Sequence, residues 1–190
     1  FIDPPDRRCF AFFHPAMVDE PLIFVEVALT RDIPAAISPI LAKDREVTAI
    51  DKTRTATFYS ISNCQRGLAG VSFGSFLIKQ VVEEVSREIP GLQTFVTLSP
   101  VTNFADWLKH ERTEEKSAAL TEADKTALVV LDQPGWWHNA EMAEQLQDPL
   151  MRAAAWYYLR ARNRRGTLVD AVARFHLGNG ARLERINWLG

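Results

Sequence analysis

The sequence predicts an α+β fold, and three observations lead to this class. Runs rich in β-branched and aromatic residues come first, at 8–14, 22–30 and 53–63. A glycine-rich stretch then leads into a segment of helical periodicity and one more strand-like run, 92–100. Most of the remaining helical pattern follows this sheet-forming part, in the region 101–165.

Composition sets limits on the kind of protein. The chain has 190 residues, 47% of them hydrophobic, which is enough to bury the core of one globular domain. The net charge is −2 with scattered Lys and Arg, so we expect no nucleic-acid partner. The two cysteines, Cys9 and Cys64, form no disulfide framework, which favours a reduced, intracellular protein. No apolar run approaches the ~20 residues of a membrane span, so we expect no membrane partner.

The first strands are separated by turn-prone residues, "PAMVDEP", and this spacing predicts an antiparallel pair. After the third strand, Leu77, Val81, Val85 and Ile89 recur four residues apart and predict an amphipathic helix that Pro90-Gly91 ends. The region 53–100 is therefore interpreted as a βαβ unit with a right-handed crossover.

The helical region carries its own start signals. Thr121-x-x-Asp124 is typical of a capping box, and Asp148-Pro149 predicts a helix that begins at this pair. Near the end of the chain, Gly178-Asn179-Gly180 predicts a turn, followed by a strand of alternating pattern.

The glycine-rich stretch "RGLAGVSFGSF" is the first candidate for chemistry. A P-loop needs Gly-Lys-Ser/Thr at the helix start, and Gly74-Ser75-Phe76 lacks the lysine. A Rossmann loop needs G-x-G-x-x-G, whereas Gly67, Gly70 and Gly74 are spaced G-x-x-G-x-x-x-G. Two explanations stay open: a diphosphate seat made of backbone N–H groups at a helix start, or a loop that is small only for packing.

Four longer stretches carry a resemblance: "FFHPAMVDEPLIFVEVALT", "FYSISNCQRGLAGVSFGSFLIKQVVEE", "FVTLSPVTNF" and "FHLGNGARLERINW". Together they resemble the catalytic domain of the malonyl-CoA decarboxylase family over nearly the whole chain. The resemblance implies a fold like that of the Gcn5-related N-acetyltransferases. This fold has a central, mostly antiparallel sheet with splayed middle strands, flanked by helices. Residues 1–190 would form one acyl-CoA-binding catalytic domain with a helical insertion at 101–165, and the family's N-terminal helical domain is absent here.

The resemblance also implies site residues. The glycine-rich stretch would be the acyl-CoA-binding motif, although it departs from the usual Gln/Arg-x-x-Gly-x-Gly/Ala pattern. Its backbone would bind the pyrophosphate of coenzyme A through Ala69, Gly70, Val71, Ser72, Phe73, Gly74 and Ser75. The catalytic pair would be Ser99 of "LSP" and His176 of "FHLGNGA". Without the family, these two would be interpreted as a turn serine and a packing histidine.

One segment departs from the family. After "LSP" the family commonly continues Ile-Pro-Gly-Phe, whereas this chain has Val101-Thr102-Asn103-Phe104. The departure puts the shape of this loop in question more than the class of reaction.

The activity that the resemblance implies is conversion of malonyl-CoA into acetyl-CoA and CO₂, through a thioester enolate that His176 protonates. The thioester is the electron sink, so we expect no metal and no cofactor. The alternatives are an acyl-CoA-dependent N-acyltransferase and a non-catalytic CoA-binding module. We also expect malonyl-CoA and acetyl-CoA as partners, a homo-oligomer formed through the N-terminal helical domain, and a cytoplasmic, bacterial location.

Overall fold

A computed structural model describes residues 4–68 and 74–190. The chain divides into two compact units, Phe1–Ser99 with Gly190, and Pro100–Leu189. We call them the sheet unit and the helical unit, and each is described by itself. The expectation of one catalytic domain over 1–190 stays a prediction.

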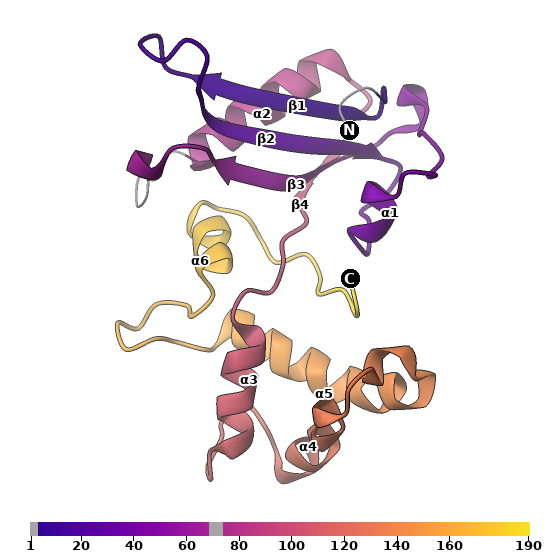
Figure 1. The fold of residues 1–190 in the computed structure, drawn as a ribbon, viewed down its shortest axis with the longest axis vertical. Helices are drawn as coiled ribbons and strands as arrows, with labels where there is room; N and C mark the ends of the chain where they lie inside the picture. Colours follow the sequence, from indigo (N-terminus) through magenta and orange to yellow (C-terminus); the bar gives the residue numbers. More distant parts are fainter. Residues whose placement is uncertain (1–3, 69–73) are drawn as a thin grey trace. The chain divides into compact units, whose positions relative to one another are not determined.

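The sheet unit is built on four strands in the order β1-β2-β3-β4 (Figure 1). Their bounds are Arg7–Phe13, Pro21–Thr30, Thr55–Asn63 and Thr94–Thr97. The first three strands pair antiparallel, and β4 pairs parallel to β3. The antiparallel start and the βαβ unit predicted from the sequence are confirmed.

Helix α2, Gly74–Glu88, covers one face of this sheet (Figure 1). Its apolar stripe packs against the strands because residues four apart lie on one side of a helix. Val81 and Val85 are buried at 1% and 0% exposure, in one cluster with Val25, Val27 and Phe58. Burying each such side chain contributes roughly 1.5–3 kcal/mol. This contact fixes the start of α2 relative to the end of β3.

The parallel pair of strands is short. It runs from Thr55 opposite Thr94 to Phe58 opposite Thr97, and the Leu98 amide then donates to the Phe58 carbonyl at 2.9 Å. On its other edge β3 stays paired with β2 as far as Asn63. β3 and β4 therefore part after this hydrogen bond, at the outer edge of the described sheet and not in its middle.

A bulge lies at the same level of β3. Glu26 pairs with Ser60 and the next residue, Val27, pairs with Phe58, so Tyr59 is one extra residue on β3. A bulge bends its strand and increases the local twist. The bend falls where β4 leaves the sheet.

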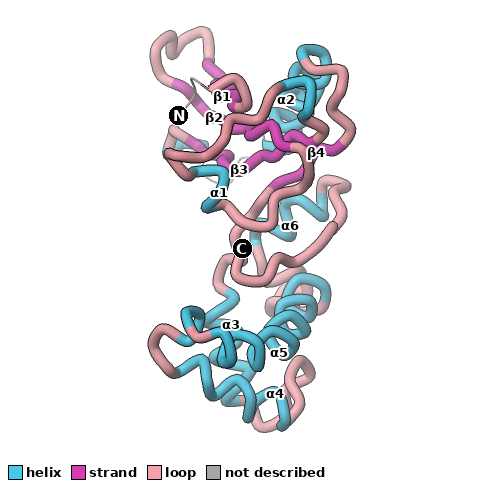
Figure 2. The backbone as a smooth tube through the Cα atoms, turned by 90° about the vertical axis from the view of Figure 1, so that its right-hand side faces the viewer, coloured by secondary structure: helices cyan, strands magenta, loops and turns pink. Residues whose placement is uncertain are grey.

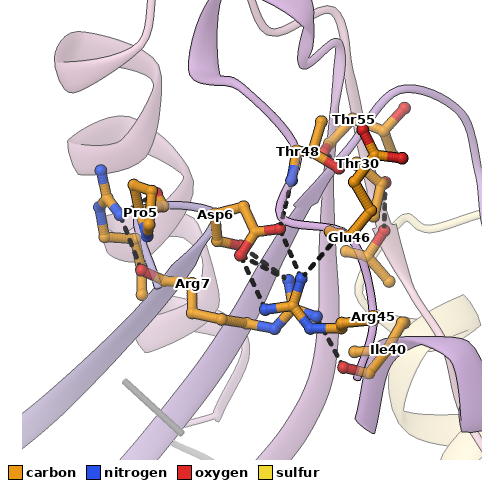
Figure 3. A network of polar contacts seen from close by, with 11 residues as sticks. Pro5, Asp6, Arg7, Thr30, Ile40, Arg45, Glu46, Thr48 and Thr55 are labelled. Carbon is orange, nitrogen blue, oxygen red and sulfur yellow. Dashed lines mark hydrogen bonds and ion pairs between the residues drawn. The ribbon is translucent and has the colours of Figure 1, made fainter. Parts of the chain in front are cut away.

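A buried network of ion pairs and hydrogen bonds lies at the start of β1 (Figure 3). Asp6 is 1% exposed and accepts hydrogen bonds from both Nη atoms of Arg45 and from the Thr48 amide, at 2.7–2.8 Å. Arg7 donates to the Ile40 carbonyl at 2.7 Å, within the short helix α1, Ser38–Leu41. The long connection between β2 and β3 is thereby tied to the start of β1.

The helical unit contains four α-helices among its described residues (Figures 1 and 2). They are α3, Phe104–Thr113; α4, Glu122–Ala127; α5, Ala140–Leu159; and α6, Ala171–Gly178. Two 3₁₀ turns, Leu128–Asp132 and Trp136–His138, join α4 to α5. A second core forms around α5, with Leu108, Leu128, Leu146, Leu150 and Ala153 buried in it.

The helix starts in this unit are partly as predicted. The capping box is confirmed, with Thr121 accepting from the Asp124 amide and Asp124 from the Thr121 amide. The start predicted at Asp148-Pro149 is wrong, because α5 already begins at Ala140, where the Asn139 side chain accepts from the Met142 amide at 3.1 Å. Pro149 lies inside the helix and is buried in the core. The predicted strand at the end of the chain is also wrong, since residues 181–190 form no strand.

Candidate active site

Ser99 stands directly after the parallel strand pair. It is half-buried and lies two residues beyond the end of β4, so it follows the strand instead of ending it. The last ladder bond, from Leu98 to Phe58, fixes the backbone just before it. Within the described part of the sheet unit its hydroxyl makes no hydrogen bond.

The loop after Ser99 keeps a shape that suits glycine. Asn103, at the position where the resembling family commonly has glycine, has φ 57°, in the left-handed region. Asparagine is among the few residues with a side chain that visit this region readily. Helix α3 begins at the next residue. The departure in sequence therefore keeps a backbone conformation that glycine would adopt freely.

His176 lies in the last turn of α6. Its imidazole is half-buried and meets the Phe175 ring edge-on, with ring centroids 5.0 Å apart. Burial lowers the pKa of His176 from its ordinary value of 6.5, because an apolar environment disfavours the charged form. The free side chain is therefore mainly neutral at pH 7.

Both ends of α6 are closed by hydrogen bonds. At the start, the Asp170 side chain accepts from the Ala173 amide at 2.7 Å. At the end, the Ala181 amide donates to the His176 carbonyl at 3.0 Å, and Gly180 has φ 90°. Glycine takes this angle without steric cost, so the predicted turn at 178–180 is confirmed and follows His176 directly.

Most of the predicted diphosphate seat, Ala69–Phe73, lies outside the described residues. Its last two residues, Gly74 and Ser75, form the start of α2, so the helix begins where the sequence predicted. The first turn of α2 contains no acidic residue. The exposed cations Arg66 and Lys79 stand before and after the seat in the sequence. These features suit an anion, since a helix start carries free N–H groups and partial positive charge.

The two predicted catalytic residues belong to different units. Ser99 is the last residue of the sheet unit before the boundary, and His176 lies in the helical unit. Sequence reasoning missed another group of the helical unit, the fully buried Asp170 at the start of the helix that carries His176. Its signal was present in the sequence, as an aspartate just before an apolar helical run, but such a cap gives no sign of its burial.

Across 4–68 and 74–190 no group of three or more His, Cys, Asp and Glu side chains is placed to hold a metal ion. In the same part of the chain, no helix has the length and apolar character needed to cross a membrane.

The sheet, with its short parallel pair and the helix across one face, defines a class of fold. The loading GNATL domain of CurA from Lyngbya majuscula matches 93% of this chain with a TM-score of 0.50 at 15% identity, and the chain covers 64% of it. This likeness concerns the fold alone. The fold is α+β and GNAT-like, as the sequence predicted.

The family follows from closer matches. The model of the malonyl-CoA decarboxylase C-terminal domain matches residues 1–190, and this chain belongs to that family. The crystal structure of malonyl-CoA decarboxylase from Rhodopseudomonas palustris matches 98% of the chain at 60% identity, with a TM-score of 0.93. The mitochondrial malonyl-CoA decarboxylase of Anser anser anser is 38% identical over 98% of the chain.

These relatives are longer than the chain. The matched part is 43% of the R. palustris chain and 41% of the goose protein. The chain therefore spans less than half the length of these relatives.

Proposed function

We propose that this chain is the catalytic part of a malonyl-CoA decarboxylase, which converts malonyl-CoA into acetyl-CoA and CO₂. The observation that carries the proposal is the match of the family's C-terminal domain model to all 190 residues. The placement of Ser99 at the point where β3 and β4 part, and of His176 in a helix end closed by hydrogen bonds, supports it.

The reaction breaks one carbon–carbon bond. The electron pair of the bond between the carboxylate and the α-carbon moves into the thioester carbonyl, CO₂ leaves, and an enolate of acetyl-CoA remains. A proton added to the α-carbon then gives acetyl-CoA. The protein accelerates this by holding the carboxylate out of the thioester plane and by supplying the proton in position.

His176 is assigned the role of proton donor. In the free protein burial favours the neutral imidazole, but the negative carboxylate of bound malonyl-CoA favours the imidazolium. Substrate binding therefore favours protonation of His176, and this proton is later transferred to the enolate. The Ser99 hydroxyl is assigned to hold either the imidazole or the malonyl carboxylate by a hydrogen bond.

Binding of the pyrophosphate of coenzyme A is assigned to the backbone from Ala69 to Ser75. N–H groups at the start of α2 would bind the pyrophosphate, since nothing acidic in the first helical turn opposes an anion. Arg66 and Lys79 would add positive charge on either side. This part of the proposal rests on the helix start and on the family's glycine-rich motif.

The remaining expectations belong to the whole protein. The thioester itself accepts the electrons, so the reaction as proposed uses no metal and no cofactor. A homo-oligomer formed through an N-terminal helical domain agrees with the greater length of the relatives. A bacterial, cytoplasmic location agrees with the higher identity to the R. palustris protein than to the mitochondrial one.

The test follows CO₂ and acetyl-CoA after malonyl-CoA is added to the full-length protein. We expect both products, and a loss of at least about 100-fold in kcat for His176→Ala and Ser99→Ala. His110→Ala is the matched control, because the His110 side chain is 67% exposed in the same unit and pairs with Glu114 at the surface. Acylation of amines without CO₂ release would favour the N-acyltransferase, and CoA binding without turnover would favour the binding module.

A further inference from the structure

Asp170 is a buried carboxylate at one end of α6, and His176 lies near the other end. We propose that Asp170, held by Thr102, is a positioning residue that fixes α6 and thereby the imidazole of His176. The inference rests on the proposed function, because it assigns His176 a catalytic task. Its geometry belongs wholly to the helical unit.

The two carboxylate oxygens of Asp170 hold different partners. Oδ1 accepts the Ala173 amide at 2.7 Å and so caps α6. Oδ2 accepts the Thr102 hydroxyl, also at 2.7 Å. Asp170 is 0% exposed. The bond from the Ala173 amide fixes the start of α6. The bond from Thr102 holds the carboxylate group in the position from which it caps the helix.

Thr102 is itself held by the core of the helical unit. The Tyr157 hydroxyl donates to the Thr102 carbonyl at 2.6 Å. Tyr157 is fully buried on α5, where its ring meets Phe104 of α3 edge-on and Trp107 of α3 at a tilt. The chain of contacts therefore runs from the rigid aromatic core through Thr102 to Asp170 and α6.

The carboxylate has no salt bridge among the described residues, which distinguishes it from Asp6 and Asp124. A buried carboxylate is costly unless hydrogen bonds compensate it, and here the helix start and the Thr102 hydroxyl do so. The charge of Asp170 also affects the pKa of a neighbouring tyrosine. Burial and the negative charge of Asp170 raise the pKa of Tyr158 to about 12.

A helix as short as α6 depends on such contacts. It has 8 residues, and isolated helices below about 12–15 residues are marginal in water. Loss of the first turn would loosen the whole helix, and His176 lies only one turn further on. Fixing the Asp170 side chain therefore reduces the range of positions open to the imidazole.

The link through Thr102 depends on its hydroxyl, and a residue without a hydroxyl at position 102 could not make it. In this chain, the threonine adds a hydrogen bond between the loop that follows Ser99 and the helix of His176.

The test compares Thr102→Val with Thr121→Val in the full-length protein. Thr121→Val removes a bond of the same kind at another helix start, because Thr121, which itself caps α4, donates its hydroxyl to Asp124 in the first turn of that helix at 2.7 Å. Of these two threonines, Thr102 is the one that bonds Asp170, the cap of α6. We expect Thr102→Val to lower kcat at least about tenfold with little change in KM, since misplaced catalytic groups lose rate. Thr121→Val should leave kcat within about twofold, and Thr102→Ser should restore it.

A second readout does not depend on turnover. The imidazole signals of the four histidines can be followed by NMR with labelled histidine, with His176 assigned from the spectrum of His176→Gln. We expect the His176 signals to shift or broaden in Thr102→Val and to stay unchanged in Thr121→Val. Unchanged His176 signals in Thr102→Val would overturn the positioning role, whatever the activity. Full decarboxylation by His176→Gln would instead overturn the catalytic role assigned to His176, and a full-length protein that releases no CO₂ would overturn the proposed function.

Discussion

The guanidinium of Arg45 holds the carboxylate of Asp6 through two parallel hydrogen bonds, Nη1 to Oδ2 at 2.7 Å and Nη2 to Oδ1 at 2.8 Å. Asp6 is 1% exposed and Arg45 15%, so this pair is shielded from water on most sides. Paired charges of this kind differ from the exposed pairs elsewhere on the chain, because removal of one partner leaves the other in a poor environment.

Asp6→Asn should therefore destabilise the protein by about 3 kcal/mol. The change removes the negative charge that faces Arg45 and replaces one of the two acceptor oxygens by an amide NH₂, which cannot accept from Arg45 or from the Thr48 amide. Urea unfolding followed by circular dichroism measures the loss. Glu84→Gln is the matched control, since Glu84 and Arg87 are 55% and 72% exposed and their pair should contribute less than about 1 kcal/mol. Equal losses in the two variants would contradict this account.

The same pair should make stability depend on acid pH. Burial acts to raise the pKa of Asp6, but the hydrogen bonds from Arg45 and Thr48 outweigh it and hold this pKa below its ordinary value of 3.8. A lowered pKa means that the unfolded chain takes up the proton first, so the contribution is present above 3.8 and is lost as pH falls through the folded pKa. We expect the stability difference between wild type and Asp6→Asn to shrink in that range. A difference that stays constant down to the acid transition would disprove it.

The pH dependence of turnover should separate free and substrate-bound protein. Burial lowers the pKa of His176 below 6.5 in the free protein, and bound malonyl carboxylate acts in the opposite direction. If the imidazolium is the proton donor, activity falls as pH rises through its pKa. The fall in kcat/KM, which reports the free protein, should lie at lower pH than the fall in kcat, which reports the complex. Coincident falls, or falls that persist in His176→Gln, would assign the titration to another group.

Asn103 tests the shape of the loop after Ser99. Its φ of 57° favours residues that accept the left-handed region. Asn103→Gly should change stability by less than about 1 kcal/mol, whereas Asn103→Val should cost about 1–2 kcal/mol in strain. Thermal unfolding and kcat measured together check this. If valine is tolerated as well as glycine, the loop does not hold the backbone in this conformation.

The sheet and α2 were predictable because their patterns are local. The four-residue spacing from Leu77 to Ile89 gives a helix with one apolar side, and the runs before it give antiparallel strands. The end of β4 was not predictable in this way, because it depends on how many residues of β4 pair with β3 in the folded protein. Pairing stops at Phe58 and Thr97, although the sequence keeps its strand character beyond them.

Two errors have the same physical origin. Asp148-Pro149 has the chemistry of a helix start, but α5 passes through it because the surrounding core buries Pro149 and its neighbours. Residues 181–190 alternate like a strand but pair with no strand in the described part of the chain. In both places a tertiary contact, or its lack, decided between conformations that the local sequence permits.

The candidate site could be proposed only through the resemblance. Ser99 before a proline and His176 beside a phenylalanine have ordinary structural explanations, and periodicity alone does not single them out. Asp170 was missed for the opposite reason. A capping aspartate is common at exposed helix starts, and only the fold shows that this one is buried with Thr102 bonded to it.

The short parallel pair also bears on the order of folding. Only a short turn separates β1 from β2 in the sequence. The glycine-rich loop and all of α2 separate β3 from β4. Closing that longer segment costs more chain entropy, and the backbone contacts that compensate it are few: four residue pairs, the Leu98–Phe58 bond, and the bonds from the Gln93 and Thr94 amides to the Arg54 carbonyl. In hydrogen exchange, the amides of β4 should therefore open before those of β2. Ser99 thus follows the strand that docks last, and bound acyl-CoA would slow its opening.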